Sequence, residues 1–177
     1  MREKRPLDWL PRWITLFVAV LGVALVDQNA LAAAGDTVAG TFQAGGKTFK
    51  LSHVYVRRQP SPSDKSKTVV VVLLTDNEVP KAIVDDKYRL ELTDLARQGK
   101  IHGVSITIGS DKKPEGTGFT YAKELDGAIV NRADQHALAA TAFDDSKLEG
   151  KLSGGGTFGD SSWKYEATVK AGIGSMK

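Results

Sequence analysis

The chain has 177 residues, with 24 lysine and arginine residues against 21 aspartate and glutamate residues and a formal net charge of +3. This small excess is not gathered into a basic stripe with interleaved aromatic residues, which argues against a nucleic-acid-binding protein. The absence of cysteine excludes disulfides, cysteine-ligated zinc and thiol catalysis.

Residues 1–34 have the three-part layout of a secretory signal peptide. A basic start precedes the uncharged apolar run Ile14–Val26, and the small residues Ala30–Ala34 follow it. The sequence therefore predicts cleavage by a signal peptidase after Ala32 or Ala34. We expect the remaining chain to be exported to the periplasm or the extracellular medium.

An uncleaved membrane anchor over Leu10–Ala34 is the alternative for the same segment. It would be the only attachment of the chain to a membrane. The apolar run is shorter than the roughly 20 residues of a spanning helix, which favours the cleaved leader.

Residues 35–171 are predicted to form a single β-rich globular domain, and residues 172–177 a flexible tail. Alternation of apolar and polar residues, the signature of a half-buried strand, begins at Thr37–Phe42. Gly45–Gly46 then provides two residues suited to a tight hairpin turn. The strand after this turn is expected to place four side chains on one face: Phe49, Leu51, His53 and Tyr55.

Three further elements are predicted between residues 68 and 108. Thr68–Thr75 is apolar without alternation, which predicts a central strand covered on both faces. An apolar stripe at helical spacing predicts a helix over roughly Asp85–Gln98 that ends at Gly99. Ile101–Ile108 alternates again and predicts a strand. A parallel strand–helix–strand crossover in this region would make the fold α+β.

The C-terminal part predicts four more short strands: Phe119–Glu124, Leu138–Phe143, Lys147–Leu152 and Trp163–Ala171. Gly154–Gly156 is interpreted as the turn between the last two. Together these patterns predict a mainly β fold, an antiparallel β-sandwich of about eight short strands with one packed α-helix. An eight-stranded barrel around a ligand cavity and an α+β fold are the alternatives.

Four polar residues are candidate binding residues. Asp76 and Glu78 follow the central strand, where carboxylates can bind a cation or act as acid and base. Turn formation and helix capping are the simpler interpretation of these two. Asp134 and His136 belong to the polar loop Asn131–His136, and loops on a rigid sheet often carry binding sites. An ordinary surface turn has the same composition.

His53 and His102 are candidate metal ligands, because both are expected on mostly apolar strand faces that could meet inside the fold. A site would need a third ligand such as Asp76, Glu78 or His136, and the corresponding function is a small metal-dependent hydrolase. No compact histidine spacing is present, so a half-buried structural histidine is the simpler account of each. We therefore predict neither a metal nor a cofactor.

Several short motifs resemble small exported bacterial proteins with a β-rich domain and no assigned activity. The motifs are Val72–Asp76, Val79–Pro80, Gly103–Val104, Gly150–Leu152 and Trp163–Tyr165. The resemblance covers about Gly40–Ala171 and implies a β-rich fold and an exported location. It implies no catalytic or binding residues.

The chain lacks the Gly-x-Ser-x-Gly motif of many serine hydrolases, and no other catalytic spacing is present. We therefore predict an exported, non-catalytic binding or structural module with an unknown ligand or protein partner. Besides the metal-dependent hydrolase, the second alternative function is a barrel-like carrier of a small apolar ligand. Its cavity would be lined by Phe49, Leu51, Tyr55 and Ile106.

Overall fold

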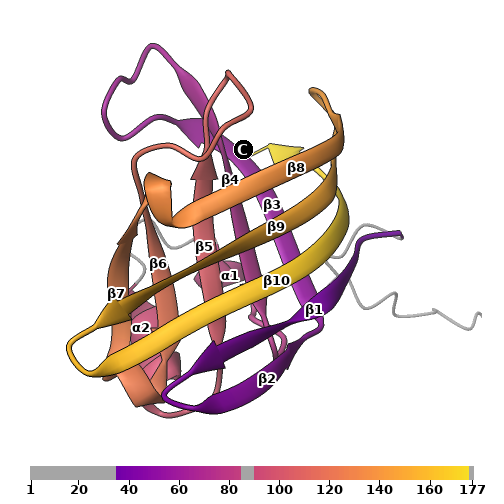
Figure 1. Cartoon of the computed structure of the whole chain (residues 1–177). Helices are drawn as coiled ribbons and strands as arrows, with labels where there is room; N and C mark the ends of the chain where they lie inside the picture. The colour runs from indigo at the N-terminus through magenta and orange to yellow at the C-terminus, as the bar shows by residue number, and fades with distance from the viewer. Residues whose placement is uncertain (1–34, 85–89, 176–177) are drawn as a thin grey trace, which may run out of the picture.

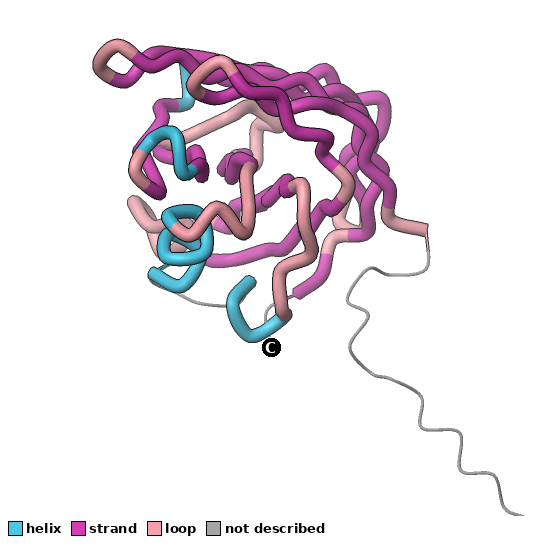
Figure 2. The backbone as a smooth tube through the Cα atoms, turned by 90° about the horizontal axis from the view of Figure 1, so that it is seen from below, coloured by secondary structure: helices cyan, strands magenta, loops and turns pink. Residues whose placement is uncertain are grey.

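The computed structural model describes residues 35–84 and 90–175. These residues form two β-sheets that face each other, with two short α-helices on the outer side of one sheet (Figures 1 and 2). The predicted leader, residues 1–34, lies outside the described residues, and so do residues 85–89 of the predicted helix.

The first sheet has five antiparallel strands in the order β2-β1-β10-β9-β8. They are β1 (Thr37–Ala44), β2 (Lys47–Leu51), β8 (His136–Phe143), β9 (Lys147–Phe158) and β10 (Ser161–Gly172). The second sheet has six strands in the order β11-β3-β4-β5-β6-β7, of which only β11 pairs in parallel. They are β3 (His53–Pro60), β4 (Thr68–Thr75), β5 (Gly103–Ile108), β6 (Thr117–Ala122), β7 (Gly127–Arg132) and β11 (Gly174–Ser175). The helices are α1 (Lys81–Val84), α2 (Leu90–Arg97) and the 3₁₀ helices η1 (Lys123–Leu125) and η2 (Ala133–Gln135).

This arrangement confirms the predicted antiparallel β-sandwich. The described part of the chain does not close into a barrel, because β2 and β8 are the edges of the first sheet and β11 and β7 those of the second. β4 and β5 are antiparallel neighbours, so the parallel crossover considered for this region is wrong. The described residues contain eleven strands, where about eight were predicted.

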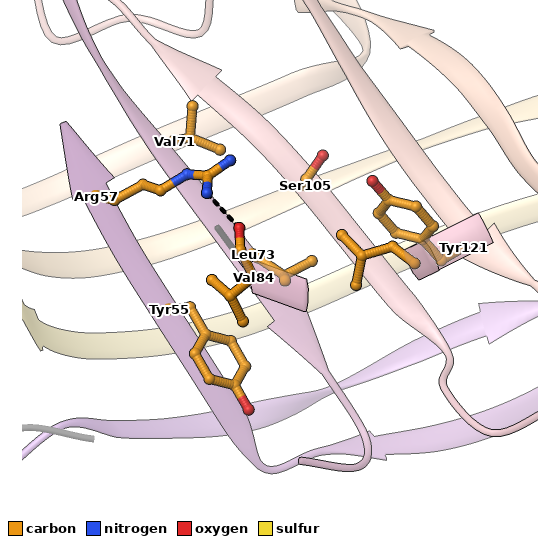
Figure 3. Close-up of a pocket in the computed structure, with 8 residues that line it drawn as sticks. Tyr55, Arg57, Val71, Leu73, Val84, Ser105 and Tyr121 are labelled. Atoms are coloured by element: carbon orange, nitrogen blue, oxygen red, sulfur yellow. Dashed lines mark hydrogen bonds between the residues drawn. The ribbon is translucent and has the colours of Figure 1, made fainter. Parts of the chain in front are cut away.

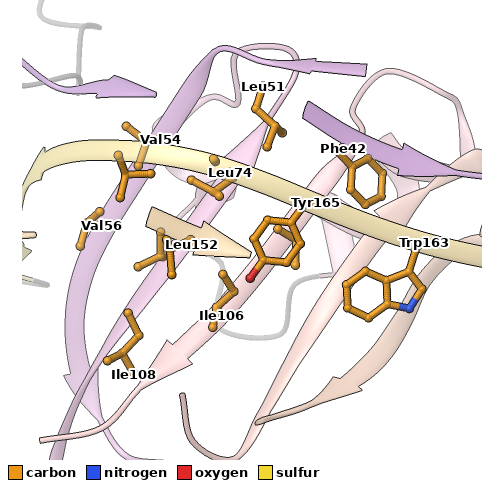
Figure 4. Close-up of a cluster of buried hydrophobic side chains, with 14 of the residues drawn as sticks. Phe42, Leu51, Val54, Val56, Leu74, Ile106, Ile108, Leu152, Trp163 and Tyr165 are labelled. Atoms are coloured by element: carbon orange, nitrogen blue, oxygen red, sulfur yellow. The ribbon is translucent and has the colours of Figure 1, made fainter. Parts of the chain in front are cut away.

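The main core lies between the two sheets (Figure 4). β4 was predicted to be covered on both faces, and its residues from Val69 to Thr75 are all buried. The alternation predicted for β10 is also confirmed, because residues from Trp163 to Ala171 are buried and exposed in turn. Full burial of one large apolar side chain stabilises a fold by about 1.5–3 kcal/mol. These two strands therefore contribute strongly to stability.

The chain changes sheets at Ser52, between β2 and β3. The Ser52 N–H donates to the Thr75 carbonyl (3.0 Å), and the Ser52 hydroxyl donates to the Asp76 carbonyl (2.6 Å). The alternation shifts by one residue at this corner, so Leu51 faces the main core while Tyr55 faces the helices. The predicted common face for the four side chains from Phe49 to Tyr55 is therefore wrong.

A smaller second core lies between the outer face of the second sheet and the helices. Leu73 of β4 and Tyr121 of β6 pack there with Leu92 of α2. The Arg57 guanidinium donates to the Val84 carbonyl and so ties β3 to α1 (Figure 3). The space left in this region is about 10 Å³, which is room for about one water molecule.

The predicted end of the helix at Gly99 is confirmed. Gly99 has a φ of 68°, and its N–H donates to the Ala96 carbonyl (2.8 Å). The Lys100 N–H donates to the Leu95 carbonyl (2.9 Å). This is the left-handed stop for which glycine is preferred.

β9 is longer than predicted. It runs through Gly154–Gly156, so the turn predicted at these residues is wrong. A Cβ on Gly154 would lie 2.7 Å from both the His136 Nδ1 and the Tyr165 Cε1. Glycine is therefore needed here to leave room for two rings, and the reversal comes later, at Gly159 with a φ of 57°.

Two C-terminal features were not predicted. β7 was missed, although it pairs with β6 over its whole length. Gly174–Ser175 pairs with Arg57–Arg58 of β3, and Ile173 packs against the main core. The second sheet therefore holds this part of the predicted flexible tail.

Candidate functional site

A hollow of about 240 Å³ opens at the end of the sandwich where β8 and β5 end. Its apolar wall comes from both sheets, with Val70 of β4 and Ile108 of β5 on one side and Phe143 of β8 on the other. The other lining residues are mostly polar: Arg58, Thr68, Gly109, Ser110, Lys112, Asp144 and Asp145.

Two cations border this apolar wall. The Arg58 Nη2 donates to the Asp145 Oδ1 (2.7 Å) and to the Asp144 carbonyl (3.2 Å). The Arg58 Nε is buried and has no hydrogen-bond partner among the described residues. The Lys112 Nζ lies 5.9 Å from the centroid of the Phe143 ring, within the range of a cation–π contact.

Two turns hold the polar residues at the rim. The Asp144 Oδ1 accepts hydrogen bonds from the Ser146 N–H (2.8 Å), the Ser146 hydroxyl (2.7 Å) and the Lys147 N–H (3.1 Å). The hydrogen bonds from Ser146 hold the pKa of Asp144 below its usual range. Lys112 has a left-handed φ of 64°, and its N–H donates to the Gly109 carbonyl (3.0 Å). This turn places the lysine beside the hollow.

A buried polar network holds the first residue of β8. The His136 Nε2 lies 2.8 Å from the Asn131 Oδ1, and the His136 Nδ1 lies 3.0 Å from the Tyr165 hydroxyl. The Asn131 Nδ2 donates to the Thr120 Oγ1 (3.0 Å), so the Asn131 oxygen accepts from the His136 Nε2–H. The Tyr165 hydroxyl then donates to Nδ1 of a neutral histidine. Burial raises the pKa of Tyr165, which keeps this donor protonated.

Because of His136, the free energy of unfolding should rise with pH between about 4 and 6.5. Burial lowers the pKa of His136 from 6.5 to about 4, although the charge of Asp134 acts in the opposite direction. The folded protein therefore binds fewer protons than the unfolded chain in this window, and stability is lost as the pH falls through it. We expect a loss of about 1–2 kcal/mol, because partial exposure of the ring reduces the full effect.

Urea unfolding of the protein and of a His136→Gln variant, at about pH 4.5 and about pH 7.5, measures this effect. The stability difference between the two pH values should be smaller in the variant by about 1–2 kcal/mol. Equal pH dependence in both proteins would contradict the role of His136.

A second histidine cluster lies where β4 ends and β5 begins, at the opposite end of the second sheet from the hollow. The His102 N–H and the His102 Nδ1 contact the two carboxylate oxygens of Asp76 at 2.7 and 2.8 Å. The His102 Nε2 lies 3.7 Å from the Glu124 Oε2, and the ring stacks on Phe49 with centroids 3.7 Å apart. The Lys47 Nζ binds the Glu124 Oε1 (2.9 Å). The cluster therefore joins the β1–β2 hairpin to the second sheet.

The electrostatics of this cluster fit a structural bridge. Burial raises the pKa of Glu124, but the hydrogen bond from Lys47 and the nearby positive charges outweigh it, so the pKa lies below its usual value. Both ring nitrogens of His102 face carboxylates, and one ring face is covered by Phe49. The alternative that the protein is a small metal-dependent hydrolase stays a prediction.

The structure brings one pair of sequence-predicted residues into contact, Asp76 and His102. His53 lies on the face of β3 that carries Tyr55, which is the outer side of the second sheet. Glu78 is exposed. Burial raises the pKa of Tyr55, and the charge of Glu78 adds to this rise. Asp76 and His102 therefore belong to one cluster, whereas His53 and Glu78 lie in other surroundings.

Asp134 and His136 also contact different partners. Asp134 forms an exposed ion pair with Arg132 (2.7 Å), whereas His136 belongs to the buried network. The predicted loop is shorter than expected, because Asn131 lies in β7 and Ala133–Gln135 forms η2. Across residues 35–84 and 90–175, no group of three or more histidine or acidic side chains is placed to hold a metal ion.

Comparisons of the chain with models of protein families, with curated proteins and with solved structures found no match. In the described residues, no helix combines the length and the apolar character needed to cross a membrane. The functional interpretation therefore depends on the geometry.

The hollow is the feature that sequence analysis missed. Arg58, Lys112 and Phe143 come from three distant segments, and none of them belongs to a known motif. The one local signal is the position of two charged turns, Ser110–Gly116 and Asp144–Asp145, directly after apolar strand ends. That signal does not show that the two turns lie at the same end of the sandwich.

Proposed function

We propose that the chain is an exported, non-catalytic binding module whose ligand occupies the hollow. The ligand is a small amphiphile with an apolar body and one anionic group. One observation carries this proposal: an apolar wall of Val70, Ile108 and Phe143 lies next to two cations, Arg58 and Lys112. The leader-like N-terminal sequence supports the exported location.

The volume of the hollow sets the size of the ligand. About 240 Å³ exceeds the roughly 150 Å³ of an engineered apolar cavity that binds benzene, a ligand of six non-hydrogen atoms. A ligand of about eight to ten non-hydrogen atoms therefore fits, such as a carboxylate on a medium-length alkyl chain. Each buried methylene group of the ligand contributes about 0.8 kcal/mol, and it packs mainly on the half-buried Phe143, because Val70 and Ile108 are already almost fully buried in the main core.

The charges favour an anionic group. The Asp144 carboxylate is already used by the hydrogen bonds of its own turn, and the Asp145 side chain is 99% exposed. The ion pair between Asp145 and Arg58 is therefore weak, and a ligand carboxylate can replace it. The buried Arg58 Nε–H has no acceptor among the described residues, and a ligand carboxylate that reached it would supply one.

This proposal moves the ligand away from the cavity expected for an apolar carrier. Leu51 and Ile106 are fully buried in the main core, and Tyr55 packs in the second core. Residues predicted to line one cavity therefore lie in two separate cores. The hollow at the end of the sandwich offers the space instead.

Octanoate is the probe that we expect to bind, and a Lys112→Asn variant tests the cationic rim. Asparagine tolerates the left-handed conformation at residue 112, so the substitution removes the charge without straining the turn. We expect octanoate to bind about three- to tenfold more weakly to the variant at low salt, measured by titration calorimetry. Lys113→Asn is the matched control, because Lys113 is exposed and does not line the hollow. Its affinity should be unchanged.

Octylamine and 1-octanol separate the chemical classes of ligand. Octanoate should bind more tightly than either, and its NMR shift changes should centre on Val70, Ile108 and Phe143. Equal affinity for octanoate and 1-octanol would support the apolar carrier instead. Shift changes elsewhere, with none at these three residues, would contradict the proposed site.

A further inference from the structure

β8 is an exposed sheet edge without charge. It pairs with β9 on one side, and no strand of the described residues lies on its other side. Ala137, Ala139, Ala140 and Thr141 are exposed, and the strand contains no lysine, arginine, acidic residue or proline. Edge strands present unpaired N–H and C=O groups, and proteins usually protect such edges with charged residues or proline. β8 lacks both protections.

The other described edges are protected. β2 carries Lys47 and Lys50, so self-pairing would bring the lysines of two copies close together. β7 ends at Arg132, and α2 packs beside it. β11 has only two residues, too few for a stable pairing. Among the described edges, β8 is therefore the only one that is both uncharged and longer than two residues.

Both ends of β8 are held in place. His136 is fixed by the buried network, and Leu138 and Phe143 pack against the main core. The turn that follows the strand contacts Arg58. The strand is therefore extended and ordered before a partner binds, which reduces the entropy lost on pairing.

We propose that two copies of this chain associate through β8, antiparallel about a two-fold axis, so that their five-stranded sheets join into one. A two-fold contact places the same surface of each copy against itself. A second copy therefore offers a strand of equal length with the same small, uncharged side chains, and no like charges meet. This contact does not involve the ligand of the hollow.

The dimer should be weak. An irregularity between Ala140 and Ala142 in the pairing with β9 limits the regular part of the strand to about Ala137–Ala140. Such a short contact buries less than the roughly 1,200 Å² of a standard stable interface. Association therefore depends on protein concentration.

Sedimentation equilibrium at protein concentrations up to about 1 mM should show a monomer–dimer equilibrium. Ala139→Lys places a lysine of each copy beside the pairing edge, and we expect it to weaken dimerisation by about tenfold or more. Ala39→Lys is the matched control. Ala39 is exposed on β1 of the same sheet, where it pairs with Thr168 of β10, and two strands separate β1 from β8. This control should leave the dimer unchanged, and thermal unfolding shows whether both variants fold.

Hydrogen exchange of the unmodified protein gives a measurement that needs no variant. The amides of residues 137–140 that point away from β9 should become more protected as the protein concentration rises, while those of β2 should not. A monomer at every concentration, or equal effects of the two substitutions, would overturn the proposal. Protection of β8 only after addition of an unrelated extended peptide would also overturn it, because the occupant would then be another chain.

Discussion

Gly154→Val should lower the free energy of unfolding by about 3 kcal/mol or more. A Cβ at this position would approach the Gln135 carbonyl oxygen to 2.5 Å and the rings of His136 and Tyr165 to 2.7 Å. β9 is paired on both sides, so the backbone cannot move away from the new side chain. The substitution would also displace His136 from its buried network. Urea unfolding at neutral pH measures the loss.

Ser153→Val is the control for this substitution. Ser153 is the neighbouring residue on β9, so its side chain points to the opposite face of the sheet. Valine favours strands, and we expect a change within about 0.5 kcal/mol. Equal unfolding midpoints for Gly154→Val and the unmodified protein would show that the rings do not pack closely across β9.

The glycines of β9 also show where sequence reasoning failed. Three consecutive glycines are most often a turn, and Gly154–Gly156 was interpreted in that way. Their role depends on the rings of Trp163 and Tyr165, which lie on the neighbouring strand and face the same core. The alternation of β10 itself was predicted correctly, because one strand with one buried face carries its own pattern.

The corner at Ser52 is a second instructive case. An apolar face was followed through Leu51, His53 and Tyr55 as if one strand continued. The chain instead moves to the other sheet, and the hydrogen bonds of Ser52 to the end of β4 fix that change. These partners are more than twenty residues away in sequence, so the local pattern holds no sign of them. The hollow was missed for the same reason, because its wall is assembled from both sheets.

Asn131→Leu should lower the free energy of unfolding by about 2–3 kcal/mol. Asn131 is fully buried, and leucine has a similar size, so the change mainly removes hydrogen bonds. The His136 Nε2–H loses its acceptor and the Thr120 hydroxyl loses its donor. Asn77→Leu is the control, because Asn77 is exposed and donates one hydrogen bond to the Lys100 carbonyl (3.0 Å). We expect it to change stability by less than about 1 kcal/mol.

The double variant Asn131→Leu with His136→Phe shows whether the network acts as a unit. His136→Phe removes the N–H that Asn131→Leu leaves without an acceptor, and a phenylalanine ring fills similar space. The double variant deprives two groups of these partners, the Thr120 and Tyr165 hydroxyls, whereas the two single variants together deprive four. We therefore expect the double variant to be about 1–2 kcal/mol more stable than the sum of the single losses predicts. Strictly additive losses would mean that the two side chains stabilise the sandwich independently, and the hydrogen bond between them would then contribute little.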